Sequence, residues 1–208
     1  MKKTVGVSPK LNSDLTAKAR IRNAAFALYA NYGEDATSMR AIAEAAGVTV
    51  GLVVHHFRTK DGLREAIEQH IVDLFFGAIE QVPLEGTTAE IAAARDEAVA
   101  DMLSDNPAVV GYLRRALLDP MGHRGRILEM LTDLAAKQVA TLRNVGVASK
   151  AHRDSSQVIG VMIRQLGQLF LQPMVDSMWN QLAGPNAAED DKPLLVVKLQ
   201  ESLSEGAS

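Results

Sequence analysis

The sequence predicts an all-α protein made of a small N-terminal domain and a larger C-terminal one. Apolar residues recur at helical spacing along the 208-residue chain, and no stretch of any length alternates apolar and polar residues as a strand would. Glycine and proline residues divide this pattern into helix-sized segments. The length suits two domains, and a hydrophobic content of 47% is enough for a sizeable core.

The first predicted helix is long and ends at Gly33. Ile21, Ala25, Leu28 and Tyr29 fall on one side of it and form an apolar stripe. Glycine accepts the backbone conformations that end a helix, which fits Gly33 as the stop.

A short second helix is expected to begin near residue 38. Thr37 or Ser38 can cap it, because a hydroxyl oxygen accepts a hydrogen bond from an otherwise unpaired backbone N–H. Gly47 is expected to end it, since glycine readily adopts the left-handed conformation of such a stop. The apolar face of this helix comprises Met39, Ile42, Ala43 and Ala46.

Another short helix follows the turn. Val48 gives the turn an apolar anchor, Thr49 can cap the helix, and Val53 and Phe57 can pin it to the core. Thr59 can cap the helix after that. Two short helices joined by a tight turn make a helix-turn-helix, whose second helix is suited to the DNA major groove. On this pattern alone, three helices of a bundle without a DNA role remain an equal alternative.

The rest of the chain is also predicted to be helical. Pro107 suits a first helical turn, where its missing N–H costs nothing. A polar loop is expected over 184–193, and residues 1–13 are expected to form a flexible tail. The predicted helices lie near residues 60–81, 88–104, 107–118, 124–145, 154–182 and 193–204.

Many residues of the N-terminal run stand at spacings typical of one protein family. They are Arg20, Ile21, Ala24, Ala25, Leu28, Gly33, Thr37, Ser38, Ile42, Ala43, Ala46, Gly47, Val48, Gly51, His56, Phe57, Lys60 and Leu63. With them, roughly residues 14–68, about a quarter of the chain, resemble the N-terminal domain of the TetR family of bacterial transcriptional regulators. The resemblance implies a three-helix helix-turn-helix DNA-binding domain over 14–62. It also implies a helical regulatory, ligand-binding and dimerisation domain over 63–204.

The resemblance implies DNA contacts from both short helices. The start of the first, with Arg40 one turn in, is expected to meet phosphates or a base edge. The N-terminal end of the second is expected to face base edges, with His55 on the same side. Lys60 matches a position that contacts phosphate, whereas His56 and Phe57 are expected to pack. The implied DNA-binding residues are Thr37, Ser38, Arg40, Thr49, Val50, Gly51, Leu52, His55 and Lys60.

One position departs from the family pattern. Two residues before the His-Phe pair the family usually has a tyrosine whose hydroxyl binds phosphate, and here that residue is Val54. Together with Val50, Gly51 and Leu52, it makes the reading helix apolar where polar groups are expected. Two explanations stay open: contact with thymine methyl groups, or specificity taken from DNA shape and phosphate contacts.

Charge is distributed unevenly along the chain. Residues 1–65 hold ten Lys/Arg and six Asp/Glu, and the remainder holds twelve Lys/Arg and nineteen Asp/Glu. A basic head on an acidic body fits one surface that faces a polyanion and another that faces away from it.

The segment 154–182 is the most apolar part of the chain, and apolar residues go nearly all round the predicted helix. Such a helix must be buried on more than one side, and Pro173 is expected to kink it. In the resembled family the last two long helices pair with their copies across a two-fold axis. The resemblance therefore implies a homodimer through the helices near 154–182 and 193–204. Its two recognition helices would lie about one DNA turn, roughly 34–36 Å, apart on a near-palindromic operator.

The middle helices carry a candidate site for a small apolar or amphipathic effector, again implied by the resemblance. Methionine adapts its shape and is common on apolar binding surfaces. The candidate polar anchors are Arg114, Arg115, His123, Arg164, Gln165 and Gln168. The alternative for each methionine is that it only fills the core. The implied ligand-binding residues are Met102, Tyr112, Leu117, Met121, Met130, Leu134, Met162, Gln165 and Phe170.

Composition and motifs argue against several classes of protein. The chain has no cysteine, so disulfides, thiolate zinc sites and thiol redox sensing are excluded. It has no run of eighteen apolar residues and no secretory signal, so a cytoplasmic protein without a membrane partner is expected. No catalytic or nucleotide-binding motif is found, and the five histidines form no metal-ligand spacing. No enzyme activity, cofactor or metal site is therefore expected.

Three functions fit these observations. The leading hypothesis is a homodimeric repressor that leaves its operator when the small ligand binds. The second is a regulator that gains DNA affinity with ligand or acts as an activator. The third is a helical ligand-binding or scaffolding protein that has lost specific operator binding, which the apolar face at 50–54 favours.

Overall fold

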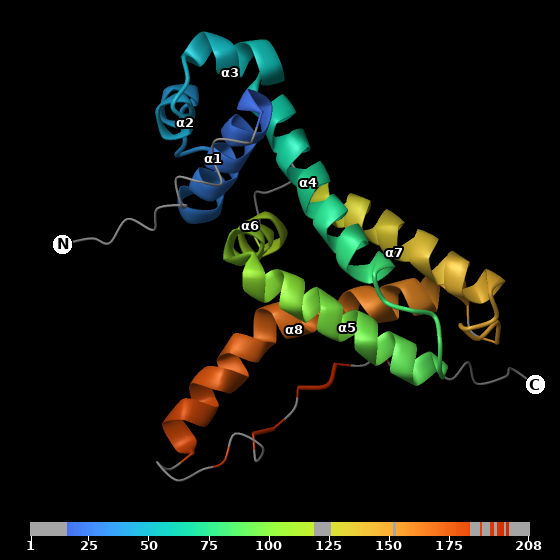
Figure 1. Cartoon of the computed structure of the whole chain (residues 1–208). Coiled ribbons are helices and arrows are strands. Elements are labelled where there is room, and N and C mark those ends of the chain that lie inside the picture. The colour runs from blue at the N-terminus through green and yellow to red at the C-terminus, as the bar shows by residue number, and fades with distance from the viewer. Residues whose placement is uncertain are drawn as a thin grey trace, which may run out of the picture. The chain divides into compact units, whose positions relative to one another are not determined.

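The computed structural model describes residues 16–118, 126–151, 153–183, 188, 192–193, 195–197 and 199. All regular structure within these residues is α-helical, which confirms the predicted fold class (Figure 1). The helices are α1 (Ala17–Tyr32), α2 (Met39–Ala46), α3 (Val50–Phe57), α4 (Lys60–Glu80), α5 (Thr88–Asp105), α6 (Pro107–Leu118), α7 (Ile127–Asn144) and α8 (Asp154–Leu182).

The chain divides into two compact units. The first takes the described residues of Met1–Phe75 and Asp101–Ile127, and so holds α1, α2, α3, most of α4, and α6. The second takes those of Phe76–Ala100 and Leu128–Ser208, which include most of α5, α7 and the whole of α8. This division does not fall after residue 62, and the extent of the DNA-binding domain stays a prediction. The tail expected over 1–13 lies outside the described residues.

The α2–α3 segment is closed by local hydrogen bonds. Ser38 Oγ accepts from the Ala41 N–H at 3.1 Å, so Ser38 rather than its neighbour caps α2. Thr49 Oγ1 accepts from the Leu52 N–H at 3.3 Å and caps α3 in the same way. Gly47 has φ 65° and ψ 40°, the left-handed conformation in which a side chain would be strained. The ends of these two helices are therefore determined by capping residues at most four positions away in the sequence.

The core of the first unit is built around α1, which packs against α2, α3 and α6. Each of these helices turns its branched or aromatic side chains inward and leaves polar residues outside. The buried side chains include Ile21, Ala25, Phe26 and Tyr29 of α1, Ile42 and Ala43 of α2, Val53 and Phe57 of α3, Leu63, Ile67 and Ile71 of α4, and Val109, Tyr112 and Leu113 of α6.

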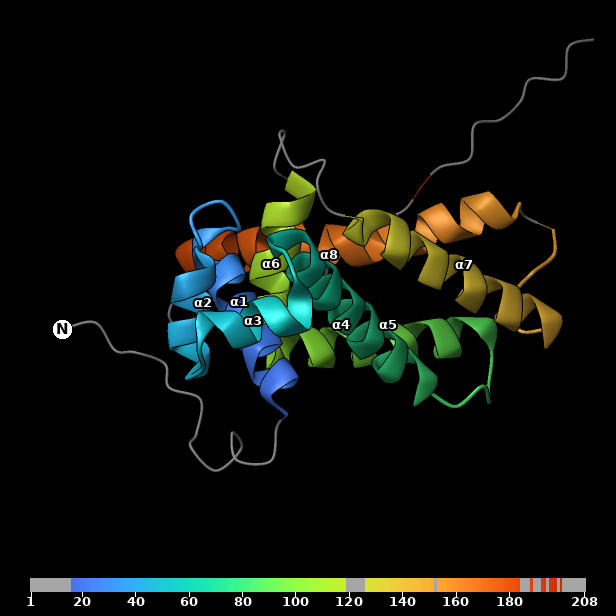
Figure 2. The same ribbon diagram turned by 90° about the horizontal axis from the view of Figure 1, so that it is seen from above.

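Helix α6 approaches the end of α1 closely (Figure 2). A Cβ built on Gly111 would lie 3.3 Å from the Ala30 carbonyl oxygen, so glycine lets the two backbones meet. The guanidinium of Arg115 donates to the Ala30 carbonyl at 3.0 Å and to the Asn31 carbonyl at 2.7 Å. A cation at the C-terminal end of a helix is favourable, because the last carbonyls there have no partner within the helix.

Two arginines, one on α7 and one on α8, form ion pairs within the second unit. Arg143 of α7 lies 2.9 Å from the Asp154 carboxylate and donates to the Gln157 side-chain oxygen at 3.2 Å. Arg164 of α8 lies 2.6 Å from Asp96 of α5, with a second contact of 3.1 Å. The charge in the apolar helix α8 is therefore paired within the chain, as a half-buried arginine requires.

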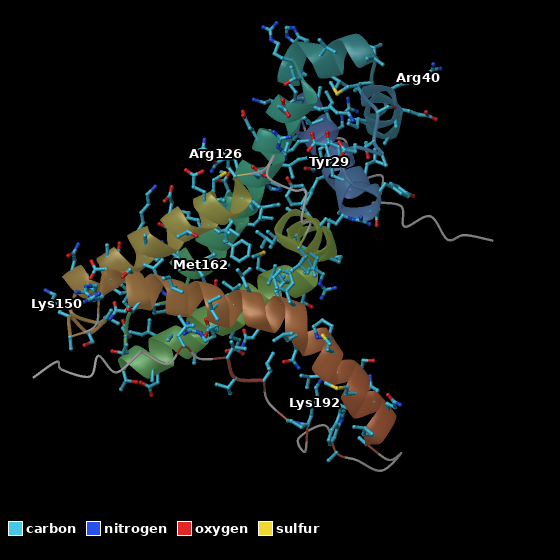
Figure 3. All side chains as sticks on the ribbon, turned by 180° about the vertical axis from the view of Figure 1, so that it is seen from behind. Tyr29, Arg40, Arg126, Lys150, Met162 and Lys192 are labelled. Carbon is cyan, nitrogen blue, oxygen red and sulfur yellow. The ribbon has the colours of Figure 1, made fainter. Side chains whose placement is uncertain are left out.

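The predicted helix over 193–204 is wrong for the residues that the structure describes, because none of 192–193, 195–197 and 199 is helical. This segment lies along α8 instead. Lys192 is 2.7 Å from Asp176, and a Cβ built on Gly167 would lie 2.7 Å from Val197 (Figure 3). Two adjacent β-branched valines favour an extended backbone, and contact with α8 outweighs the helical spacing of the leucines.

Among the described helices, α8 is the one that by length and composition could cross a membrane. A core helix of a soluble protein passes the same test. The helix contains Pro173 and changes direction along its course (Figure 1).

At the corner between α3 and α4, the backbone at Gly62 lies close to the end of α3. A Cβ built on Gly62 would lie only 2.3 Å from the Phe57 carbonyl oxygen, so the backbone must move to admit a side chain. We expect Gly62→Ala to lower the free energy of unfolding by about 1–3 kcal/mol in urea titrations. The matched control is Gly77→Ala in the same helix, where a Cβ would meet nothing within 4 Å. Alanine at position 77 is expected to add up to about 1 kcal/mol, and equal effects at both positions would contradict the close approach.

Candidate DNA-binding surface

Six of the nine predicted DNA-binding residues are exposed on α2 and α3: Ser38, Arg40, Thr49, Val50, Gly51 and His55. Leu52 and Lys60 are half-buried. Arg40 extends away from α2, whereas Tyr29 lies among the side chains of the interior (Figure 3). The helix-turn-helix therefore presents these side chains from two short, capped helices.

Thr37 is the exception among the predicted residues. Its side chain is buried, at 3% exposure. Its hydroxyl donates to the Gly33 carbonyl at 2.7 Å, and its N–H donates to the Glu34 carbonyl at 3.0 Å. Both donors of Thr37 are used inside the protein, so the residue shapes the loop before α2 and is left out of the candidate surface.

The buried side chains of α3 set the orientation of the helix about its own axis. Val53 and Phe57 are buried, and the Lys18 ammonium of α1 lies 5.9 Å from the centre of the Phe57 ring. A cation at this distance over an aromatic face is attracted to it. Phe57 has the packing role expected of it, and His56 is half-buried beside it. Gly51 and His55 lie on the side of the helix away from Val53 and Phe57, whereas Val50 and Val54 are exposed at the edge of the buried side.

The loop between α1 and α2 is fastened to α4 through Glu34. Lys60 Nζ donates to the Glu34 carbonyl at 3.0 Å. Arg64 donates to both oxygens of the Glu34 carboxylate, at 3.0 and 3.1 Å, and lies 2.8 Å from Asp61. Lys60 has three N–H donors, so this bond leaves others for a phosphate. Sequence reasoning missed the role of Glu34, because its partners are 26 and 30 residues away.

Arg58 was also missed. It is exposed at the corner after α3, and its φ of 64° is uncommon for a residue with a side chain. Its N–H donates to the Val54 carbonyl at 2.9 Å and ends the helix. Its position two residues before Lys60 makes it a further candidate for phosphate contact. The signal in the sequence was a basic residue directly after the buried Phe57.

Below the reading helices, Glu68 of α4 is buried at 1% exposure. One carboxylate oxygen accepts from the Tyr112 hydroxyl of α6 at 3.1 Å, and the other accepts from the Arg126 N–H at 3.1 Å. Burial raises the pKa of Glu68 above its usual value, and the two hydrogen bonds oppose that shift. Phe26 of α1 meets the Tyr112 ring edge-on, with 5.9 Å between ring centres.

The predicted ligand-binding residues are distributed over both units. Met102, Tyr112 and Leu117 belong to the first unit, and the other described ones belong to the second. Tyr112, Leu134 and Met162 are buried, and Met102, Leu117, Met130, Gln165 and Phe170 are half-buried. Met121 lies outside the described residues. Where the structure is described, no group of three or more His, Asp or Glu side chains is placed to hold a metal ion.

An exposed, capped recognition helix, a glycine turn and flanking basic side chains define a helix-turn-helix DNA-binding protein. Residues 21–67 match the family model described as bacterial regulatory proteins, tetR family. Over 192 residues the chain is 30% identical to the HTH-type transcriptional repressor Rv1474c of Mycobacterium tuberculosis, a match that spans 91% of this chain and 94% of that protein. The chain belongs to the TetR family and is a DNA-binding transcriptional regulator.

A second relative and a solved structure are also similar to the chain. The HTH-type transcriptional regulatory protein RaaS of Mycobacterium tuberculosis is 48% identical over 62 residues, which cover 30% of this chain and 29% of that regulator. The TetR-family transcriptional regulator PfmR of Thermus thermophilus shares the fold, with a TM-score of 0.55 and 21% identity. That likeness covers 83% of this chain and 92% of the other.

The buried carboxylate of Glu68 generates a pH prediction. Because the folded chain holds this proton more tightly than the unfolded chain, the free energy of unfolding should fall as pH rises above the ordinary value of 4.5. Glu68→Gln removes the ionisable group, and its amide can still accept from the Arg126 N–H. We expect the free energy of unfolding of the variant to fall less as pH rises. The difference between variant and parent should therefore shift in favour of the variant between about pH 4.5 and neutrality.

Urea titrations at several pH values measure this difference. Glu65→Gln is the matched control, because Glu65 is exposed on the same helix. The same change of pH profile in both variants would contradict a special role for the buried carboxylate.

Proposed function

We propose that this regulator is a homodimeric repressor that binds a near-palindromic operator and leaves it when a small apolar or amphipathic ligand binds. The observation that carries the proposal is the exposed outer face of α3, capped by Thr49 and flanked by Arg40 and Lys60. We take 14–62 as the DNA-binding domain and 63–204 as the regulatory domain. The relative from Mycobacterium tuberculosis that matches over nearly its whole length is named a repressor.

Dimerisation is proposed through α8. A stripe of apolar side chains runs along this helix and is exposed in the single chain. Burying it against a second copy would remove it from water and give the two-fold symmetry that a palindromic site requires. Because the segment after 192 is not helical where described, the proposed interface rests on α8 alone. The stripe consists of Ile159, Ile163, Leu171, Met174, Met178 and Leu182.

The effector is proposed to bind the regulatory domain among the buried and half-buried methionine and aromatic side chains predicted above. Flexible methionines suit a ligand whose shape is not rigidly specified. Of the suggested polar anchors, Arg115 and Arg164 hold partners inside the chain, to α1 and Asp96 respectively. The proposed regulator acts on DNA in the cytoplasm, with no catalytic step and no membrane partner.

Selection of bound DNA from a random pool at physiological salt tests the proposal. We expect the purified protein to enrich a near-palindromic motif. Gly51→Glu is the matched negative control, because it brings a carboxylate against the DNA at an exposed position where a side chain meets no clash within the protein. A folded protein that enriches nothing would favour the ligand-binding or scaffolding alternative. Tight binding by Gly51→Glu would mean that α3 does not dock on DNA.

Lys60 generates a prediction about salt dependence. We expect Lys60→Ala to weaken binding to all DNA sequences and to reduce the slope of log affinity against log salt by about one unit, since one phosphate contact is lost. Lys60→Arg keeps the charge and is expected to keep the slope. Thermal unfolding of both variants separates this effect from loss of the bond to the Glu34 carbonyl. An unchanged slope in Lys60→Ala would refute the phosphate contact.

A further inference from the structure

Helix α3 carries an apolar strip at the edge of its buried face, where two valine side chains are partly exposed. Val50 and Val54 are one helical turn apart and are 41% and 43% exposed. Val53 and Phe57, each three residues after one of these valines and on the same side of the helix, are buried and supply the packing that holds α3 in the fold. The exposed part of each valine is apolar surface that is left to water in the free protein.

Gly51 lies between these valines and has no structural reason to be glycine. A Cβ built there would meet only Thr49 Oγ1, at 3.9 Å, and its backbone is ordinary helix. A glycine inside a helix costs about 1 kcal/mol relative to alanine. Its missing side chain leaves the α3 backbone uncovered beside the valines, which permits close approach of another surface. That surface is inferred to be the floor of the DNA major groove, since α3 is the recognition helix of the motif.

The polar groups next to the strip serve other purposes. The Thr49 hydroxyl oxygen accepts the capping hydrogen bond from Leu52. Arg40 and Lys60 lie on the flanks, where the phosphates of a bound duplex would run. A valine side chain has neither donor nor acceptor, so it cannot read the hydrogen-bonding edge of a base. The apolar group that a base pair presents in the major groove is the C5-methyl of thymine.

We propose that Val50 and Val54 form a methyl-reading strip, which selects thymine at two positions in each operator half-site. This inference rests on the proposed operator binding and names the chemistry that α3 recognises. Of the two explanations for the apolar helix, the proposal takes direct contact with thymine methyl groups rather than DNA shape. The loss of one methyl contact should weaken binding about fourfold, the effect of exposing one methyl-sized group.

The test starts from the selected operator. Each thymine is replaced in turn by deoxyuridine, which keeps every hydrogen-bonding group and lacks only the methyl. Two symmetric pairs of positions should show the fourfold loss, and the other thymines should show none. If all the deoxyuridine operators bind like the parent, the methyl-reading strip is wrong while operator binding stands. If no operator can be selected, both proposals fail.

Protein variants show which valine meets which methyl. Val54→Ala and Val50→Ala should each weaken binding to the thymine operator, and each should be insensitive to deoxyuridine at one position only. Val145→Ala, which changes an exposed valine of the second unit, is the matched control and should bind like the parent. Circular dichroism checks that α3 is retained in each variant. Additive losses at every position would overturn the assignment, because groups that do not touch act independently.

Discussion

The position of the reading helices depends on how one residue, Glu34, is held. Its carbonyl accepts from Lys60 and its carboxylate from Arg64, so the loop between α1 and α2 is fixed at two points to the start of α4. Ser38, the cap of α2, follows four residues later. The Arg64 and Glu34 side chains are mostly shielded from water, so each would be poorly solvated without the other. This pair places the N-terminus of α2, and through the Gly47 turn it also places α3.

Three helices of the first unit are joined beneath that loop in a closed ring of polar contacts. Glu34, in the loop that follows α1, bonds to α4; Glu68 joins α4 to α6, and Arg115 joins α6 back to the end of α1. Each contact satisfies a group that burial or a helix end would otherwise leave unpaired. A ring restrains the angles between helices better than apolar packing alone, because hydrogen bonds are directional. The helices that support the helix-turn-helix are therefore oriented by polar contacts as well as by apolar packing.

The outer face of α3 follows a different principle. Val53 and Phe57 are buried in the core, whereas Val50 and Val54 are partly exposed and Gly51 leaves the backbone between them uncovered. Exposed apolar side chains and a helical glycine both lower the stability of the free protein. In the proposed complex a bound duplex covers these residues, which would offset this cost.

The sequence by itself determined where most helices begin and end. Gly33, Gly47, Thr49 and Pro107 act on groups within about four residues, so their effects are visible in a short window. The choice of Ser38 over Thr37 as cap, and the burial of Thr37, needed the tertiary structure. So did the partners of Glu34 and Glu68, which lie 26 to 58 residues away. The helix predicted over 193–204 failed for the same reason: helical spacing is a local preference, and contact with α8 outweighed it. Local hydrogen bonds can be predicted from neighbouring residues, because donor and acceptor are close in the sequence. Pairing between distant side chains forms only when packing brings them together.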